Sequence, residues 1–178
     1  MDMFIEKMVA RKRRGKDFAI AVTSVFSTIL LSAIIFLLVI SVPMLFFLAP
    51  LFPLLIASLI FLCYRIIAMQ KVEFEYSLTN DELDIDKILA KRRRKRVVTL
   101  NARNIDILAP ITNPRYQSEK SSAGLTNTYD CSNGTKNSDV YFVVFFNAGG
   151  LKSMLLFEPN QKMIDGFKRY SPQKVYEL

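Results

Sequence analysis

The chain has 178 residues, of which 51% are hydrophobic and 22% are charged, and its formal net charge is +8. Every Asp, Glu, Lys and Arg residue lies outside residues 18–64, and an uncharged block of that length excludes a fully soluble globular protein. The absence of histidine excludes His-based catalysis and His-containing metal sites, and two cysteines are too few for a disulfide-stapled fold.

Residues 1–17 form a basic amphipathic segment. Four apolar side chains fall on one side of a helix drawn over Met3 to Arg14, whereas the cations lie elsewhere around it. This pattern is typical of a short helix in the membrane interface. The alternative is a topology signal that keeps the N-terminus inside, and one cluster can serve both purposes. The four apolar residues are Phe4, Ile5, Met8 and Val9.

The uncharged block would be about 70 Å long as a single helix, more than twice the hydrocarbon thickness of a bilayer, so it must fold back. We predict a two-helix transmembrane hairpin over residues 18–68, with helices at Phe18 to Ser41 and Leu45 to Ala68. Pro50 and Pro53 would kink the second helix, or else delay its start to Pro53 and leave Met44 to Leu51 as a reentrant turn. We favour the kinked full span.

Lysine and arginine residues flank both ends of the hairpin, and its turn has none. Positive residues near a span are retained inside, so we expect a multi-pass protein of the cytoplasmic membrane with both termini cytoplasmic. A cleaved signal peptide is the rival interpretation of the first helix, but its apolar region is too long and a second apolar span follows. The expected membrane-interface residues are Arg11, Lys12, Arg13, Arg14, Tyr64 and Arg65.

Beyond Lys71 the hydrophobic period changes from that of a helix to that of a strand. Apolar and polar residues alternate from Val72 to Thr79, and Asn80 with Asp81 supplies a turn. A second strand follows around Leu83 and Ile85, a third spans Arg96 to Leu100, and a fourth ends at Pro110. We predict an antiparallel meander in a domain over residues 71–178.

The segment from Ile111 to Ser138 is rich in Asn, Ser, Thr and Gly and reads as a loop that is mobile or functional. Val140 to Phe146 is an unbroken apolar run, so as a strand it must be central and covered on both faces. Leu151 to Phe157 returns as its partner. A short helix opens at Asn160 and places three apolar residues on one face: Met163, Ile164 and Phe167.

Phe74 to Pro110 reads strand, turn, strand, basic segment, strand and Ile-rich strand. With the membrane hairpin before it and a C-terminal helix after further strands, this succession resembles the pleckstrin-homology-like (PH-like) domains of small bacterial membrane proteins. The resemblance implies a membrane α-helical hairpin plus an α+β domain, in which an antiparallel PH-like β-barrel or sandwich is closed by the C-terminal helix. It implies no known activity, and the Ile111 to Ser138 insertion departs from a compact example.

The most conspicuous local feature is a run of six cations. They could engage anionic lipid headgroups or a partner, and each cation close to an anionic leaflet contributes about 1 kcal/mol. They could instead pair with Glu73, Glu75, Asp84 and Asp86 on neighbouring strands. Nucleic acid is a weaker third ligand, because a membrane-fixed protein rarely meets it. The six residues are Lys91, Arg92, Arg93, Arg94, Lys95 and Arg96.

No convergent catalytic set, cofactor motif or metal cluster is recognisable. Cys131 lacks a second nearby thiol or a histidine, and solvent-facing alternation explains Asp84 and Asp86. We therefore expect a non-enzymatic membrane-anchored binding module that engages a protein partner or anionic lipid headgroups at the cytoplasmic face. The alternative is a structural subunit of a membrane protein assembly, and an enzyme would need a buried pocket that gathers several acidic, Lys, Tyr or Cys side chains.

Overall fold

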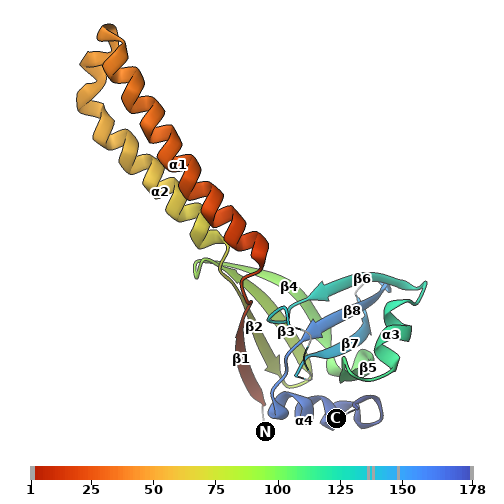
Figure 1. Ribbon diagram of the computed structural model, residues 1–178. Coiled ribbons are helices and arrows are strands. Elements are labelled where there is room, and N and C mark those ends of the chain that lie inside the picture. Colours follow the sequence, from red (N-terminus) through yellow and green to blue (C-terminus); the bar gives the residue numbers. More distant parts are fainter. Residues whose placement is uncertain (1–2, 136, 138, 148, 177–178) are drawn as a thin grey trace. The chain divides into compact units, whose positions relative to one another are not determined.

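The computed structural model describes residues 3–135, 137, 139–147 and 149–176 (Figure 1). It divides into a helical unit, Arg13–Lys71, and a β unit made of Met1–Lys12 and Val72–Leu178. The β unit is thus built from two stretches of chain that the helical unit separates. Each unit is described by itself below.

The helical unit contains helix α1 (Gly15–Ser41), the 3-10 segment η1 (Pro43–Leu51) and helix α2 (Phe52–Met69). The favoured kinked helix from Leu45 is wrong, and the delayed start is correct. Pro53 occupies the first turn of α2, where a missing N–H costs nothing, and Pro50 falls in the 3-10 segment instead of an α-helix interior.

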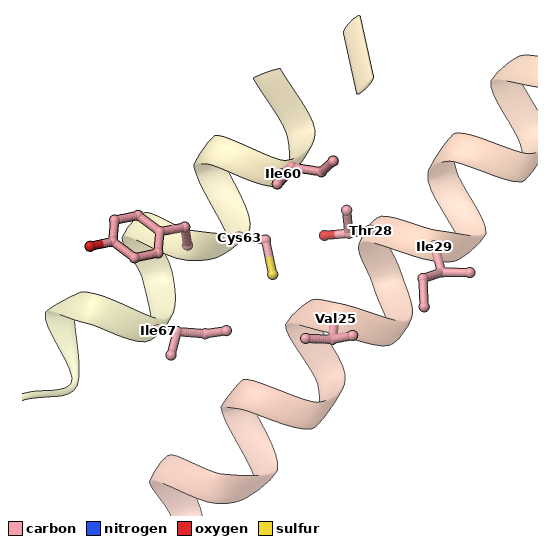
Figure 2. A pocket seen from close by; sticks show the side chains of 7 residues that line it. Val25, Thr28, Ile29, Ile60, Cys63 and Ile67 are labelled. Atoms are coloured by element: carbon pink, nitrogen blue, oxygen red, sulfur yellow. The ribbon is translucent and has the colours of Figure 1, made fainter. Parts of the chain in front are cut away.

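The two helices meet along positions spaced three and four residues apart. On α1 the half-buried residues include Ala21, Ser24, Thr28 and Ser32, and Cys63 of α2 lies 3.9 Å from the Ser24 hydroxyl, sulfur to oxygen. Figure 2 shows Cys63 on α2 and Thr28 on α1 between the two helices. The hydroxyls of Ser24 and Thr28 donate to backbone carbonyls one turn earlier, at 2.9 and 2.8 Å. Small residues with satisfied hydroxyls allow two helices to pack closely.

Residues 4–10 form strand β1 (Phe4–Ala10), so the predicted N-terminal helix is wrong. Ile5, Lys7 and Val9 turn towards the interior of the β unit, whereas Phe4 and Met8 are exposed. The same residues satisfy a short helical face and a period-2 alternation, and pairing with a neighbouring strand decides between them.

That neighbour is β2 (Val72–Thr79), which follows the helical unit. The two strands pair antiparallel from Phe4 opposite Thr79 to Ala10 opposite Glu73. Beyond the ladder the backbone N–H of Arg11 donates to the carbonyl of Val72 at 3.0 Å. The helical hairpin is therefore inserted between the first two strands of the domain and does not precede it.

Sheet A has the order β1-β2-β3-β4 and is antiparallel throughout, with β3 at Glu82–Leu89 and β4 at Arg93–Asn101. The predicted turn between β2 and β3 is confirmed, and Asn80 adopts the left-handed backbone conformation there, with φ of 53°. A 3-10 turn, η2 (Ala102–Asn104), then ends sheet A.

Sheet B has the order β5-β7-β8-β6. Its strands are β5 (Ile105–Pro110), β6 (Leu125–Asp130), β7 (Tyr141–Phe146) and β8 (Lys152–Phe157). The predicted four-strand meander is thus wrong in one member, because β5 joins sheet B and β1 takes the fourth place in sheet A. The β6–β8 pair is parallel, and the two sheets remain open instead of closing into a barrel.

The main core lies between the sheets and includes Tyr76, Ile85, Phe145 and Phe157. Helix α4 (Gln161–Tyr170) adds its predicted apolar face to this core. Its N-cap is the side chain of Asn160, which accepts from the Met163 N–H at 2.8 Å, and the 3-10 turn η3 (Pro172–Lys174) follows it.

A second, smaller core covers the other face of β7, where Phe142 and Val144 pack with Tyr116. Tyr116 belongs to α3 (Arg115–Lys120), so the prediction of a bare loop over residues 111–138 is wrong. That segment supplies both α3 and β6, although Lys136 and Ser138 lie outside the described residues. The central position and two-sided burial of β7 are confirmed.

Candidate functional site

The six-cation run begins in the turn between β3 and β4. Ala90 and Lys91 both have positive φ, 52° and 56°, and the Arg92 N–H donates to the Leu89 carbonyl at 3.1 Å. These features define a two-residue turn of the type that favours Asn-Gly, because its central residues are left-handed. The turn is tight, and it projects Lys91 and Arg92 from the end of the sheet.

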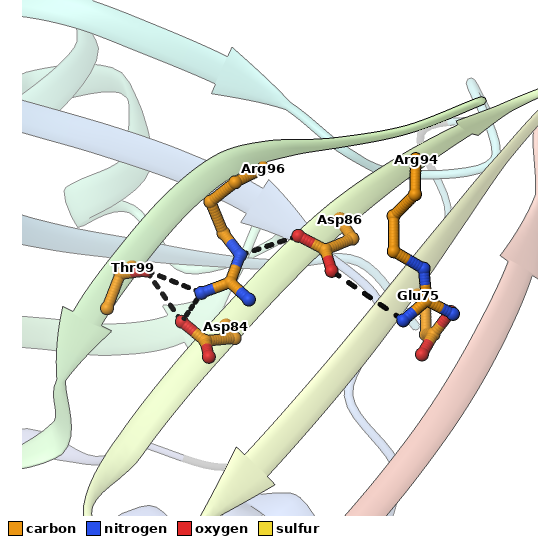
Figure 3. Close-up of polar contacts among 6 residues, drawn as sticks. All are labelled: Glu75, Asp84, Asp86, Arg94, Arg96 and Thr99. Atoms are coloured by element: carbon orange, nitrogen blue, oxygen red, sulfur yellow. Dashed lines mark hydrogen bonds and ion pairs between the residues drawn. The ribbon is translucent and has the colours of Figure 1, made fainter.

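Two of the six cations are held in ion pairs on the outer face of sheet A (Figure 3). Arg94 contacts Glu75 at 2.5 Å, and Arg96 contacts both Asp84 and Asp86 at 2.5 Å. The hydrogen bond that Arg96 donates to the Asp86 carboxylate raises the pKa of Arg96 above its ordinary value. Arg94 and Arg96 therefore pair with acidic residues of neighbouring strands, as one of the two interpretations of the cation run predicted.

A β-bulge makes this arrangement possible. Arg96 lies opposite Asp86 while Val98 lies opposite Ile85, so Val97 is an extra residue in β4. Without it, Arg94 and Arg96 would share the buried face with Val98, since side chains alternate along a strand. The bulge turns them outwards to the acidic side of β2 and β3.

The remaining four cations have no ion pair among the residues that the structure describes. Lys95 lies directly opposite Lys87 of β3, another lysine without a described ion pair, and like charges across a ladder repel. The sequence argument missed Lys87, and only the strand register reveals it. We call this group the basic tip: Lys87, Lys91, Arg92, Arg93 and Lys95.

The basic tip lies at a defined end of sheet A. Val72 at the start of β2 pairs with Leu89 at the end of β3, which pairs with Arg93 at the start of β4. Ala10 at the end of β1 pairs beside them with Glu73. The chain therefore leaves for the helical unit, and returns from it, at the same end of the sheet as the basic tip.

The predicted membrane-interface residues fall in both units. Arg11 and Lys12 continue β1, and the Lys12 N–H donates to the Asn133 carbonyl at 2.8 Å. Arg13 and Arg14 begin the helical unit, in which Arg14 is the N-cap of α1. The remaining two interface residues lie in α2, where Tyr64 is exposed and Arg65 half-buried.

Cys131 is not an accessible thiol. It is 1% exposed within the main core, and burial raises its pKa to about 12. A thiol in that state is a poor nucleophile at neutral pH. Among the described residues, no group of three or more Cys, Asp or Glu side chains could hold a metal ion.

The β unit also has a polar cavity of about 380 Å³ between β1, the start of β7 and α4. Glu158, buried in its wall, accepts the Asn133 backbone N–H at 2.7 Å and the Asn133 amide at 3.3 Å. The carboxylate therefore fastens the turn after β6. This contact explains a buried acid that the sequence did not single out.

Comparison with known proteins gives one positive result. No curated protein and no solved structure matches the chain. Residues 1–177 match the family described as Bacterial PH-like domain (DUF6106), and the match includes β1, the helical insertion and both sheets. This protein is therefore a member of that bacterial PH-like domain family.

Proposed function

We propose that this protein is a non-enzymatic, membrane-anchored binding module whose PH-like domain engages anionic lipid headgroups through its basic tip. The observation that carries the proposal is the grouping of five cations without described ion pairs at the end of sheet A that leads to two apolar helices. PH-like domains are generally binding modules, and this supports a role without catalysis.

The helices support a membrane anchor by length and composition. The first apolar helical span, Gly15–Ser41, has 27 residues. The second, Ala49–Met69, has 21 and combines the end of η1 with α2. The most apolar 18 residues of each span are 0% buried within the protein. At 1.5 Å per residue, both exceed or match the hydrocarbon thickness of about 30 Å. Exposed apolar helices of this length are stable in a bilayer and costly in water.

The insertion supports a hairpin that returns to the side from which it started. Because Ala10 pairs with Glu73, the two ends of the insertion lie one ladder spacing apart, about 5 Å. A chain that leaves and re-enters the same pair of strands crosses a membrane an even number of times. The cations at both ends support a cytoplasmic location for that side, and with it for both termini.

Cysteine labelling in intact cells tests this topology. Cys63 is replaced by Ala, the buried Cys131 is left in place, and a single reporter is introduced as Phe47→Cys in the turn or Ala123→Cys in the β unit. In intact cells, a membrane-impermeant maleimide should label the reporter at position 47 but not the reporter at position 123. The reporter at position 123 should be labelled only after lysis. Labelling of position 123 in intact cells would refute a cytoplasmic domain.

Hydrogen exchange tests the lipid role on the full-length protein in nanodiscs. Backbone amides of the tip should exchange more slowly in discs that contain phosphatidylglycerol than in neutral discs, and 1 M salt should abolish the difference, because the Debye length falls to about 3 Å. Reversal of three unpaired cations, K91E/R92E/R93E, should remove this protection. Equal exchange in neutral and anionic discs would refute lipid contact.

A matched control separates the tip from net charge. The variant K120E/K162E/R169E changes the net charge by the same amount at exposed positions outside the tip. It should leave the protection intact. Arg94 and Arg96 are unsuitable for either variant, since their loss would remove the described ion pairs of Glu75, Asp84 and Asp86.

A partner protein has its own supporting feature on the outer face of sheet A. Phe4 and Met8 on the edge strand β1 are 65% and 55% exposed. Exposed apolar side chains beside an unpaired strand edge favour association with another chain. Crosslinking in membranes followed by mass spectrometry tests whether the protein is instead a subunit of an assembly, and recovery as a monomer would exclude that alternative.

A further inference from the structure

Strand β1 forms one edge of sheet A (Figure 1). At its two ends the Asn80 N–H donates to the Met3 carbonyl at 2.8 Å, and the Arg11 N–H donates to the Val72 carbonyl at 3.0 Å. Because the β1–β2 register is unbroken and bonding alternates along an antiparallel ladder, the odd-numbered residues of β1 bond to β2. The backbone N–H and C=O groups of the even-numbered residues point away from β2 and have no other partner among the residues that the structure describes: Phe4, Glu6, Met8 and Ala10.

The end of this edge already makes a backbone hydrogen bond of the kind that an added strand would make. The next even-numbered N–H, that of Lys12, donates to the Asn133 carbonyl at 2.8 Å. This bond closes the edge beyond Ala10. The segment that another strand can extend is therefore β1 itself, Phe4–Ala10.

The side chains of the even-numbered residues lie on the outer face of sheet A. Phe4 is 65% and Met8 is 55% exposed, and Glu6 is exposed between them without an ion pair among the described residues. Side chains directly opposite each other in a ladder share a face and interact. An added strand would thus be complementary if it carried a basic residue opposite Glu6 and an apolar residue on either side, opposite Phe4 and Met8.

Lys7 makes the inner side of the edge suitable for a polar residue. A lysine that points inwards usually protects an edge strand, because an added strand would bury its charge. The Lys7 side chain instead lines the polar cavity of about 380 Å³ described above, together with Asp139, Glu158 and Gln161. A polar residue placed opposite Lys7 would therefore have room and polar neighbours.

A second copy of the chain is a poor occupant of this edge. The antiparallel register that pairs all of β1 with itself places Lys7 opposite its counterpart, and a shift in one direction places Glu6 opposite its counterpart. Like charges directly opposite each other destabilise a ladder. A shift in the other direction brings each strand onto Lys12, whose edge N–H is already bonded to Asn133.

We infer that the edge of β1 binds an extended segment of another protein as a fifth strand of sheet A, with a Lys or Arg side chain opposite Glu6 and apolar side chains opposite Phe4 and Met8. Main-chain hydrogen bonds supply affinity in this mode of recognition, and the alternate side chains supply specificity. The inference deepens the partner-protein role given above. It does not depend on the lipid role of the basic tip.

Fluorescence anisotropy tests the inference with the full-length protein in detergent micelles at physiological salt and a labelled synthetic peptide, TVNKNIT. Its pattern of apolar, basic and apolar residues is the same in both strand directions, and its Asn residues face inwards. The peptide should bind, and the peptide TVNENIT should bind about fivefold more weakly, the upper range for a cross-strand charge pair. Glu6→Lys should reverse this preference.

Ala10→Pro tests the backbone contribution. The Ala10 N–H points away from β2, so proline removes one edge donor while the β1–β2 ladder stays intact, and binding of TVNKNIT should weaken about fivefold. An unchanged urea midpoint confirms that the variant folds. Unchanged binding by the folded variant would exclude pairing at this edge.

Glu82→Lys is the matched control, because Glu82 is an exposed acid of sheet A on β3 instead of the edge strand. It should bind both peptides as the wild type does. No binding at about 1 mM peptide, or equal effects of Glu82→Lys and Glu6→Lys, would overturn the inference. A concentration-dependent dimer that the peptide dissociates would assign the edge to a second copy and also overturn it.

The basic-tip variant K91E/R92E/R93E separates this inference from the lipid role. It should bind TVNKNIT as the wild type does, because none of its three positions lies on β1. If peptide binding fails while the lipid-dependent protection of the tip stands, only the strand-addition site is wrong. If the protection fails while peptide binding stands, only the lipid role is wrong.

Discussion

The replacement Tyr76→Phe removes one hydroxyl from the centre of the β unit and leaves the ring in place. That hydroxyl donates to the Cys131 carbonyl at 2.6 Å and accepts from the Glu158 N–H at 3.4 Å, so it ties β2 of sheet A to the ends of β6 and β8. Tyr76 is 0% exposed, and its edge contact with Phe157 survives the change. A buried carbonyl left without its partner costs about 2 kcal/mol of unfolding free energy.

The pH dependence of this difference has a defined sign. Burial raises the pKa of Tyr76 well above its ordinary value of 10.0, so the unfolded chain ionises near pH 10 while the folded chain does not. Above pH 10 the wild type loses about 1.4 kcal/mol per pH unit from this residue, and the Phe variant does not. The difference in unfolding free energy between the wild type and Tyr76→Phe should therefore shrink by about 0.8 kcal/mol at pH 10.5 and vanish near pH 11.5.

Pulse proteolysis of the full-length protein in detergent micelles over a urea gradient measures both free energies, with a protease that is active at alkaline pH. The buried thiol of Cys131 also weakens the fold above pH 9, because burial raises its pKa to about 12, but it does so equally in both proteins. A difference below about 0.5 kcal/mol at neutral pH would refute the bridging role of the hydroxyl. A difference that grows with pH would refute its burial.

Three further outcomes follow from the fold. A variant in which a short Gly-Ser linker replaces residues 13–71 should fold, because β1 can still pair with β2. A variant that begins at Lys71 lacks β1 and should unfold at a lower urea concentration. Equal urea midpoints for the two variants would show that β1 is dispensable. Replacing Ala90 and Lys91 with Asn-Gly should raise the unfolding free energy by about 1 kcal/mol in urea titrations, by relieving left-handed strain, and no gain would exclude that strain. Cys131 should react with a maleimide only after unfolding, and rapid labelling of the folded protein would contradict its burial.

The strands with a clear alternation were predictable because their signal is local. Val72 to Thr79 and the turn at Asn80 are as expected, and the apolar run of β7 correctly indicated a strand covered on both faces. The resemblance to PH-like domains is confirmed. Local alternation could not predict that the two sheets stay open, because closure into a barrel depends on pairing between strands that are distant in the sequence.

The first strand was missed because the seven residues of β1 fit both the helical period and the period-2 alternation of a strand. Pairing with β2 settles the choice, and the partner begins at Val72, after the whole hairpin. The cover of β7 was missed for a similar reason. Only Tyr116 of α3 is buried, and β6 carries three Thr and Asn side chains, so neither element has a strong apolar signal of its own.

At the candidate site the sequence identified the cations but not their division. Which of them are paired depends on the bulge at Val97, and no composition rule locates a bulge. The like-charge contact of Lys87 with Lys95 depends on register in the same way.

The interrupted β1–β2 ladder also sets the order of events during synthesis. β1 leaves the ribosome first, yet its partner follows 59 residues of hairpin, or several seconds later at about 5–20 residues per second. The strand is unpaired during that time, and in the proposed topology the helices enter the bilayer before β2 is available for pairing. Once inserted, the hairpin holds the end of β1 close to the start of β2. The entropy of closing that long loop is then lost before the two strands pair. Delayed insertion would therefore prolong the exposure of an unpaired strand edge, which favours aggregation.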